Sequence, residues 1–377
     1  IKVAFVSTNS IVQGEQVGIL WKYLMLKKGL IIHFAHQTFK WNNDAPGVAA
    51  VYCVIIGFAY VDTPKKYLYE YETIKSEPKE KEAEHINAYL VAGDDVFVEN
   101  RNKPICDAPK MMYGSKPTDG GYFLFTDKEK IEFLKDEPSA EKFIKPFISA
   151  KEFLNNEKRW VLWLVGADPS ELRQLLKVTE RVDAVKKFRL ESKAKSTRDY
   201  PYHTLFRQVT QPNSDYVLVP RTTSENRTYI PMAFLSKEDI ISDTCQAVVG
   251  ATLYHFGVLE SLMHMTWVRY TCGRLKSDYR YSKDIVYNNF PWPENVSDEN
   301  KKKVGESVQG VLDARAPLPE SSLADLYDPN TMPPELVKAH TDLDRAVDAC
   351  YGKKFPTKES RIEFLFELYK KYTSKYE

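Results

Sequence analysis

Charged side chains at alternate positions mark the segment of this chain that could do chemistry. Between Cys272 and Ser282 they are Arg274, Lys276, Asp278 and Arg280. Alternate residues of an extended backbone share a face, so these four would form one row. Lysine donates to guanine O6 or N7 and aspartate accepts from cytosine N4, so Lys276 and Asp278 could contact both halves of one G·C pair. The competing interpretation is a solvated edge strand that its charges protect from aggregation.

A basic run from residue 181 to residue 198 could contact phosphate groups. It holds seven Lys or Arg against two Asp or Glu. Such contacts position a protein on DNA without specifying sequence. The alternative is a solvated helix face. The residues that we assign to phosphate contact are Lys186, Lys187, Arg189, Lys193 and Lys195.

Two further arginines, Arg221 and Arg227, are candidates for base contact because of their charge and their position in a loop. They could equally bind phosphate or pair with Glu225, which lies between them. Since the net charge of the chain is only +1, any surface that binds nucleic acid must be a local one.

Composition limits which other kinds of protein and of site are possible. A length of 377 residues allows two or three domains, and five cysteines far apart, without a CxxC pair, argue against a zinc site or a disulfide framework. We therefore predict no metal site, reduced thiols and a cytoplasmic protein. No apolar run approaches the roughly 20 residues of a membrane helix. The first residues lack a start Met and already resemble a buried strand, so we expect a fragment of a longer polypeptide.

The elements that must position these residues follow from periodicity. Apolar runs at 3–7, 30–34 and 49–60 predict strands, the first of them a central parallel strand, with a helix before Gly29. This succession is half of a doubly wound α/β sheet. The middle of the chain predicts a strand from Trp160 and three short strand or turn segments at Tyr216–Pro220, Tyr229–Pro231 and Ala247–Gly250. The helices that periodicity predicts run from Asp168 toward Lys187, from Thr252 to Cys272, and over 298–313, 333–350 and 358–376.

Long strings of this sequence resemble the MmeI-like restriction–modification proteins, which fuse a DNA N6-adenine methyltransferase to an endonuclease. Cys272–Ser282 and Tyr287–Pro293 resemble the end of the target-recognition domain of that family. The resemblance covers nearly the whole chain, and its other strings are Phe5–Val17, Phe34–Asn43, Lys145–Ile148 and Arg159–Trp160.

The resemblance implies three parts. Residues 1–80 would be the C-terminal part of the methyltransferase domain, an α/β remnant of a Rossmann-like sheet. Residues 81–295 would be an α+β target-recognition domain, and residues 296–377 an α-helical C-terminal domain. The expected partners are double-stranded DNA and the missing N-terminal nuclease and methyltransferase half of the same polypeptide.

The resemblance also implies S-adenosylmethionine as the cofactor of the parent enzyme. Neither a glycine-rich cofactor turn nor an Asn/Asp-Pro-Pro-Tyr/Phe loop occurs here, so the cofactor-binding residues are unknown. We expect the chain alone to be catalytically incomplete and to bind no cofactor. Phe39 matches the aromatic that stacks on the extruded adenine, with Trp41 as the alternate. Both rings could instead pack on the sheet edge, with Asn42 and Asn43 forming a turn.

Two expectations remain for the sites. The string Ser7–Ser10, at the end of the first strand, either lines the cofactor or adenine pocket or caps the following helix. In the resembled family the positions of Lys276 and Asp278 select one base pair, and that of Arg280 contributes at a neighbouring one.

Two other functions for the whole chain remain as alternatives to the methyltransferase interpretation. One is a stand-alone DNA specificity subunit that recruits a methyltransferase, and the other is an unrelated protein-interaction module.

Overall fold

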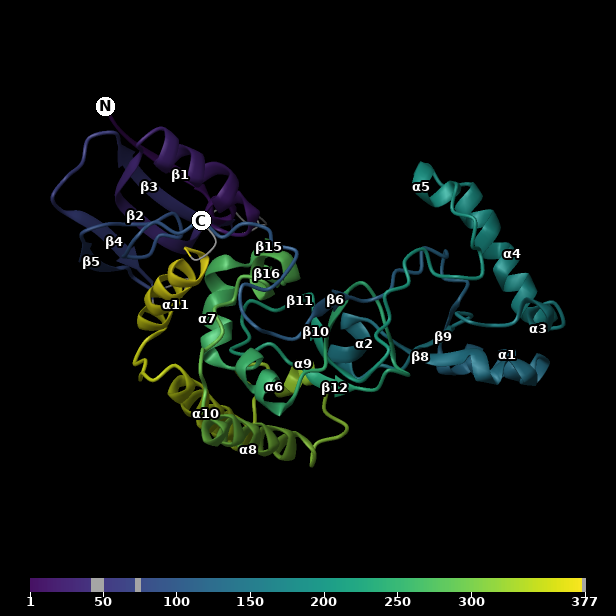
Figure 1. Ribbon diagram of the computed structural model, residues 1–377. Helices are drawn as coiled ribbons and strands as arrows, with labels where there is room; N and C mark the ends of the chain where they lie inside the picture. Colours follow the sequence, from purple (N-terminus) through teal and green to yellow (C-terminus); the bar gives the residue numbers. More distant parts are fainter. Residues whose placement is uncertain (42–50, 72–75, 375–377) are drawn as a thin grey trace.

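The computed structural model describes residues 1–41, 51–71 and 76–374. Figure 1 shows an elongated molecule with three regions. A sheet built from the first strands forms one end, and an arm of helices and short strands forms the other. The last helices pack beneath the middle. The first region is mixed α/β, the middle one, called the recognition region after the expectation from the sequence, is α+β, and the last one, the C-terminal region, is helical.

The N-terminal sheet has the strand order β1-β3-β2-β4-β5. Its members are β1 (Lys2–Thr8), β2 (Ile31–Trp41), β3 (Val51–Ala59), β4 (Lys66–Glu70) and β5 (Lys79–Ala83). Strand β3 lies antiparallel to both β1 and β2, so β1 and β2 run in the same direction with β3 between them. Only β2 and β4 pair in parallel.

The predicted strand positions are confirmed, but the prediction of a central parallel strand at residues 3–7 is wrong. Within the described sheet β1 is an edge strand, because the returning strand β3 occupies the place beside it. Its apolar side chains are not covered: Phe5 is 60% and Val6 53% exposed. The predicted helix that follows consists of two π-helical segments, Val17–Trp21 and Tyr23–Lys27.

The recognition region contains three small sheets, ordered β12-β10-β14-β6, β13-β8-β9-β7 and β11-β16-β15. Their strands are β6 (Met111–Tyr113), β7 (Leu124–Phe125), β8 (Ile144–Ile148), β9 (Trp160–Leu162), β10 (Tyr216–Pro220), β11 (Thr222–Thr223), β12 (Ala233–Leu235), β13 (Ile240–Ile241), β14 (Cys245–Val249), β15 (Gly273–Leu275) and β16 (Asp278–Arg280). Strands this short need a buried scaffold to hold them. The predicted strand that begins at Trp160 is confirmed by β9.

The helices of this region are α1 (Asp127–Asp136), α2 (Ala150–Asn155), α3 (Pro169–Leu172), α4 (Leu176–Leu190), α5 (Lys195–Arg198), α6 (Leu253–Leu259) and α7 (Leu262–Thr271). Two predicted helices are each divided. The one that starts after Asp168 breaks between α3 and α4, and the one between Thr252 and Cys272 breaks at Glu260. Ser261 then caps α7 by accepting from the His264 amide.

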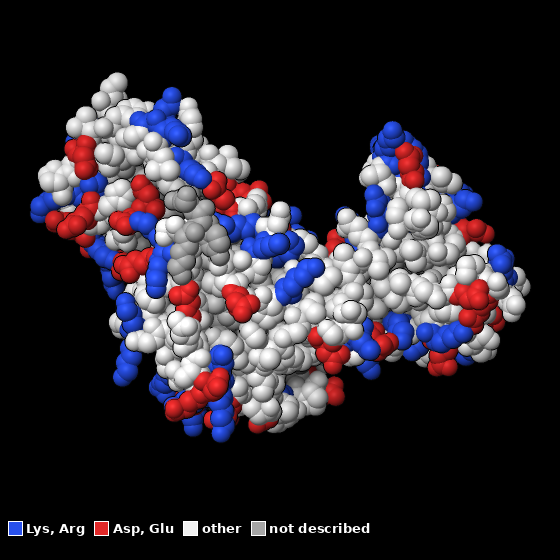
Figure 2. Space-filling model, in the orientation of Figure 1, with Lys and Arg blue, Asp and Glu red and all other residues white. Residues whose placement is uncertain are grey.

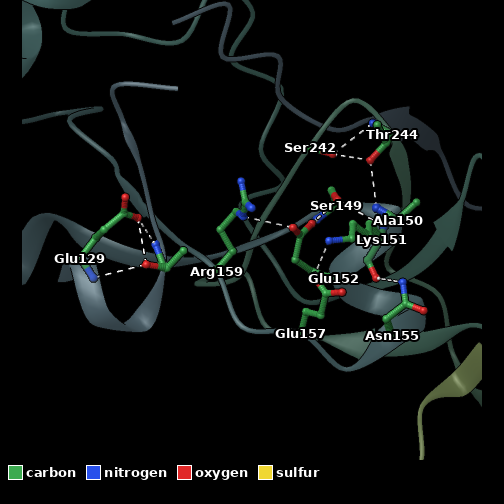
Figure 3. A network of polar contacts seen from close by, with 11 residues as sticks. Glu129, Ser149, Ala150, Lys151, Glu152, Asn155, Glu157, Arg159, Ser242 and Thr244 are labelled. Carbon is green, nitrogen blue, oxygen red and sulfur yellow. Dashed lines mark hydrogen bonds and ion pairs between the residues drawn. The ribbon is translucent and has the colours of Figure 1, made fainter. Parts of the chain in front are cut away.

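A polar network fastens α2 to the neighbouring strands (Figure 3). The carboxylate of Glu152 is buried and accepts from the amide and hydroxyl of Ser149, which closes a capping box at the start of α2. Its other oxygen lies 3.1 Å from Arg159 Nε. Thr244 Oγ1 accepts from the Ala150 amide at 2.9 Å, so the segment before β14 is held against the same helix end. The network thus joins α2 to the residue before β9 and to the segment before β14.

The C-terminal region confirms the predicted helices. It contains α8 (Asp298–Arg315), α9 (Leu323–Leu326), α10 (Pro334–Cys350) and α11 (Lys358–Thr373). Ser297, Ser322 and Thr357 cap α8, α9 and α11 with their side chains. These caps supply hydrogen bonds that the first turn of each helix would otherwise lack.

A buried polar cluster joins the C-terminal helices to the recognition region. Glu260 is 1% exposed and forms an ion pair with Arg315, at the end of α8. The hydroxyl of Tyr327 donates to Glu260 Oε1 at 3.0 Å and lies 2.8 Å from His340 Nε2. Burial lowers the pKa of His340 to about 3, so this imidazole is neutral. A charge at Glu260 is tolerated inside the protein only because Arg315 compensates it.

Candidate nucleic-acid interface

The segment with alternating charges forms a tight hairpin. Strands β15 and β16 are antiparallel, with Leu275 opposite Asp278, and the two residues of the turn are Lys276 and Ser277. The backbone of Lys276 has φ +57°, a left-handed conformation that reverses the chain. The prediction of a single extended row of four charges is therefore wrong. Lys276 and Asp278 nevertheless lie together, at and beside the tip of the hairpin.

The hairpin presents free charge at two places, at its tip and at its base, where Arg280 lies opposite Gly273. Lys276 and Arg280 are exposed, and neither forms an ion pair with another residue of the described ranges. Asp278 is half-buried, and its Oδ1 accepts a hydrogen bond from the Glu225 amide at 3.3 Å. A two-stranded ribbon of this kind fits the major groove of B-DNA.

Arg274 has a different position from the one that the sequence predicts. Its guanidinium lies over the Tyr279 ring, 3.7 Å from the centroid, and Nη1 donates to the Ser277 carbonyl at 3.0 Å. These contacts hold the Arg274 side chain against the hairpin, so Arg274 stabilises the turn and is not one of the free charges. Strand pairing places Arg274 opposite Tyr279, which explains why these two residues meet.

Arg221 and Arg227 are both half-buried. Arg221 Nη1 donates to the Asp243 carbonyl at 2.9 Å, and Arg227 Nη1 donates to Thr223 Oγ1 at 3.0 Å. Burial lowers the pKa of Arg227. The proposed pairing of these arginines with Glu225 is not found, because that carboxylate accepts from the Tyr52 hydroxyl. Both arginines are thus anchored beside the hairpin by neutral oxygen atoms.

The basic run forms the arm that carries α4 and α5, and four of its five assigned residues are exposed. These residues are Lys186, Lys187, Lys193 and Lys195. Arg189 is the exception, and its assignment to phosphate contact is wrong. It is 0% exposed and donates four hydrogen bonds of 2.8–3.0 Å to backbone carbonyls. The acceptors are Pro117, Thr118, Tyr202 and Leu205.

Figure 2 shows that this face of the molecule is hollowed between the end that carries the N-terminal sheet and the arm that carries α4 and α5. Blue Lys and Arg side chains gather on the near wall of the hollow, where Figure 1 places β15 and β16. The hairpin therefore lies on a concave face and carries two exposed cations without an ion-pair partner among the described residues, and a local basic patch of this kind is a feature of nucleic-acid-binding surfaces.

An aromatic cluster occupies the N-terminal sheet near the end of β2. The ring of Phe39 is stacked with Tyr71 at 5.5 Å, and His36 is stacked with Tyr69 at 4.2 Å. Trp41 is 48% exposed and lies 6.1 Å from Phe39. One face of Phe39 is thus already occupied by an aromatic neighbour. The positions expected to form a turn, Asn42 and Asn43, lie outside the described residues.

The sequence interpretation missed Tyr69 and Tyr71. The available signal was the alternation of Tyr69, in β4, with Tyr71, directly after that strand, because alternate residues of an extended backbone share a face. Burial lowers the pKa of His36, whose Nδ1 lies 2.8 Å from the Tyr71 hydroxyl.

A pocket of about 450 Å³ lies where the three regions meet. Among its walls are Asn9 and Tyr71 from the sheet, Arg274 from the hairpin and Lys358 from α11. Of the string Ser7–Ser10, Asn9 therefore faces a pocket. The turn Asn9–Val12 that follows β1 has no side-chain cap, so the capping interpretation is not supported.

The hairpin and the sheet meet at a close backbone contact. Gly14 has φ +57°, its amide donates to the Thr271 carbonyl at 3.1 Å, and a Cβ atom there would lie 3.1 Å from Gly273 Cα. A larger residue at this position would push the start of β15 away from the sheet. The segment that follows β1 and the start of the hairpin are thus packed against each other through their backbones.

The residues that the structure describes give little support to a metal site, a disulfide or a membrane-spanning helix. They contain no group of three His, Cys, Asp or Glu side chains that could hold a metal ion. The five cysteines are free thiols. Among the described helices, none combines the length and the apolar character needed to cross a membrane.

The fold joins an N-terminal sheet to a separate region that carries an exposed basic hairpin, and comparisons with known proteins identify the family. The chain matches the models of three MmeI domains: the DNA-methyltransferase domain at residues 1–70, the target recognition domain at 92–294 and the C-terminal domain at 296–377. The chain therefore belongs to the MmeI family.

Two relatives support this assignment. The chain is 41% identical over 379 residues to DNA methyltransferase A of Bacillus subtilis (strain 168), covering 99% of this chain and 42% of that protein. A solved structure of the type IIL restriction–modification enzyme MmeI in complex with DNA superimposes with a TM-score of 0.90 at 50% identity. It covers 99% of this chain and 50% of the MmeI chain. The chain thus spans about half the length of the relatives it matches.

Proposed function

We propose that this chain is the C-terminal part of a site-specific DNA adenine-N6 methyltransferase of a restriction–modification system, and that it recognises the target sequence. The observation that carries the proposal is the hairpin tip. Lys276 is exposed and unpaired there, and Asp278 lies beside it on a hollowed face next to the methyltransferase sheet. The MmeI relative was solved in complex with DNA, which supports double-stranded DNA as the partner.

Recognition would take place in the major groove. Lys276 Nζ donates to O6 or N7 of a guanine, and the carboxylate of Asp278 accepts from N4 of the paired cytosine. Arg280 is exposed on the same hairpin and would contact a neighbouring base pair. The exposed lysines of α4 and α5 would bind phosphates and hold the duplex in the hollow.

The methyltransferase remnant would receive the extruded adenine. Phe39 is the proposed stacking residue and Trp41 the alternate, since both rings lie at the end of β2 near the pocket between the regions. Phe39 already stacks on Tyr71, so the base would extend an existing aromatic stack.

The parent enzyme would use S-adenosylmethionine as methyl donor. The residues of this chain do not fit that group by themselves, because β1 is followed by the turn Asn9–Val12 and not by a glycine-rich cradle. We propose that the cradle and the nuclease belong to the N-terminal half of the same polypeptide, and that this chain alone does not transfer a methyl group.

Exposed apolar side chains favour this proposal over a stand-alone specificity subunit. Phe5 and Val6 on β1, and Ile19 and Leu26 on the following helical segments, are each more than half exposed. Phe5 and Val6 are consecutive in a strand, so each face of the sheet carries one exposed apolar side chain there, and large exposed apolar side chains of this kind mark surfaces that another protein surface covers. The other half of a methyltransferase domain would cover them, whereas a specificity subunit has no need for such a sheet.

A charge exchange at the hairpin tests the proposal. In the full-length protein, Lys276→Glu combined with Asp278→Arg should change the preferred base pair at one position of the methylated sequence, because the donor and the acceptor exchange places. One well-formed contact discriminates by about 1–3 kcal/mol. Long-read sequencing of N6-methyladenine in the DNA of the expression host reports the motif.

A matched control exchanges an exposed ion pair on α8, with Lys303→Glu and Glu299→Arg, where the two charges lie 2.6 Å apart. That variant should keep the motif. An unchanged motif in the hairpin variant, at full methylation, would exclude a role for Lys276 and Asp278. Binding of duplex DNA that does not weaken with salt would instead favour the protein-interaction module.

A further inference from the structure

One hydrogen bond joins the methyltransferase sheet to the recognition loop beside the hairpin. The hydroxyl of Tyr52, on β3, donates to Glu225 Oε1 at 2.6 Å. Glu225 follows β11, whose Thr222 and Thr223 pair with β16. The bond therefore connects two regions that are 173 residues apart in sequence.

The same residue also holds the predicted base-contacting carboxylate. The amide of Glu225 donates to Asp278 Oδ1 at 3.3 Å. Asp278 Oδ2 accepts no hydrogen bond from the residues that the structure describes, and Asp278 is half-buried. One oxygen is thus fixed by the protein, while the other is left to accept from DNA.

Electrostatics keep this link intact at neutral pH. Burial, and then the neighbouring Glu225 carboxylate, raise the pKa of Tyr52 to about 12. The phenol therefore keeps its proton and stays a donor. Glu225 forms no ion pair with a described Lys or Arg, so the Tyr52 hydroxyl is the side-chain partner that orients its carboxylate.

We propose that Glu225 and Tyr52 are positioning residues for base-pair selection. Tyr52 orients Glu225, the Glu225 backbone fixes Asp278, and the base pair contacted at the hairpin tip is thereby held at a set distance from the adenine site. This inference rests on the proposed function. It adds two residues that need not touch DNA to the determinants of specificity.

The experiment measures discrimination at the one base pair that Asp278 contacts. Full-length Tyr52→Phe and Glu225→Ala variants lose the link, and we expect each to lose about ten-fold in preference for the cognate pair at that position. Methylation is counted on cognate sites and on sites that differ only there. Glu225→Gln keeps an acceptor oxygen for Tyr52 and should retain the preference of the native protein. Tyr60→Phe, just after β3 and 67% exposed, is the matched tyrosine control.

Two results would overturn the inference. Preference unchanged within two-fold in Tyr52→Phe and Glu225→Ala, with thermal melting showing both folded, would mean that the link does not position Asp278. A uniform loss of methylation at every site, without a change of preference at this position, would mean that the link only supports the fold. Failure of the proposed function is a separate outcome, since the Lys276→Glu and Asp278→Arg exchange would then leave the motif unaltered.

Discussion

Replacing Arg189 should destabilise the recognition region strongly, although Arg189 lies in a basic helix that the sequence assigns to phosphate contact. Arg189→Met removes four hydrogen bonds to backbone carbonyls. The Pro117 and Tyr202 carbonyls keep a backbone amide donor, whereas the Thr118 and Leu205 carbonyls lose the donor that the structure gives them. An unsatisfied buried acceptor costs about 1–3 kcal/mol. Taking about 2 kcal/mol for each of the two unsatisfied carbonyls gives a loss of about 4 kcal/mol. For a unit of 150–250 residues this lowers the melting temperature by roughly 8–16 °C.

Lys187→Met is the matched control, two positions earlier on the same helix and exposed. Its stability should stay within about 0.5 kcal/mol of the native protein. Its DNA binding should change instead, because the loss of one phosphate contact lowers the slope of log K against log salt by about 0.9. Circular dichroism melts and anisotropy titrations at several salt concentrations measure both quantities. An Arg189→Met protein that melts like the native one, or that shows the lower salt slope of Lys187→Met, would refute this reasoning.

Two further predictions concern the C-terminal helices. Burial raises the pKa of Asp344 to about 7, so between about pH 4 and pH 7 the folded state keeps a proton that the unfolded state has released. The free energy of unfolding should therefore fall as the pH rises from about 4 to 7. Urea unfolding measures it at each pH, and the Asp344→Asn protein should not show this fall. An identical pH profile in both proteins would contradict it. A Cβ on Gly257 would lie 2.5 Å from Val304 Cγ1, so Gly257→Ala should cost about 1–3 kcal/mol in thermal melts. Gly310→Ala, with open space around its Cβ, should instead stabilise by about 0.4–1 kcal/mol, and a loss of equal size in both variants would argue against the packing explanation.

The C-terminal helices were predictable because local signals agree there. Serine or threonine stands before α8, α9 and α11, and apolar residues recur with helical spacing after each cap. The broken helix at Glu260 had one local signal, a lone carboxylate in an apolar stretch. Its partner Arg315 lies 55 residues away, so the sequence could not show what makes the break stable.

The hairpin and Arg189 were mispredicted for a physical reason of the same kind. The turn residues Lys276 and Ser277 include no glycine or asparagine, so nothing local indicates the left-handed backbone. Charge counts also predict exposure poorly, since the carbonyls that receive Arg189 come from residues near 117 and near 202. Contacts of long sequence separation decide both features.

The buried Glu260–Arg315 pair has a consequence for the transfer of DNA specificity between relatives. A chimera joined between the recognition region and α8 separates the two charges unless both parents carry them, and breaking such a pair costs about 3–5 kcal/mol. The junctions of such a chimera should therefore not lie between Glu260 and Arg315, so that both residues come from the same parent. Substitutions at Lys276 and Asp278 leave the pair in place, so under the proposed function they are the less disruptive route to a new target sequence.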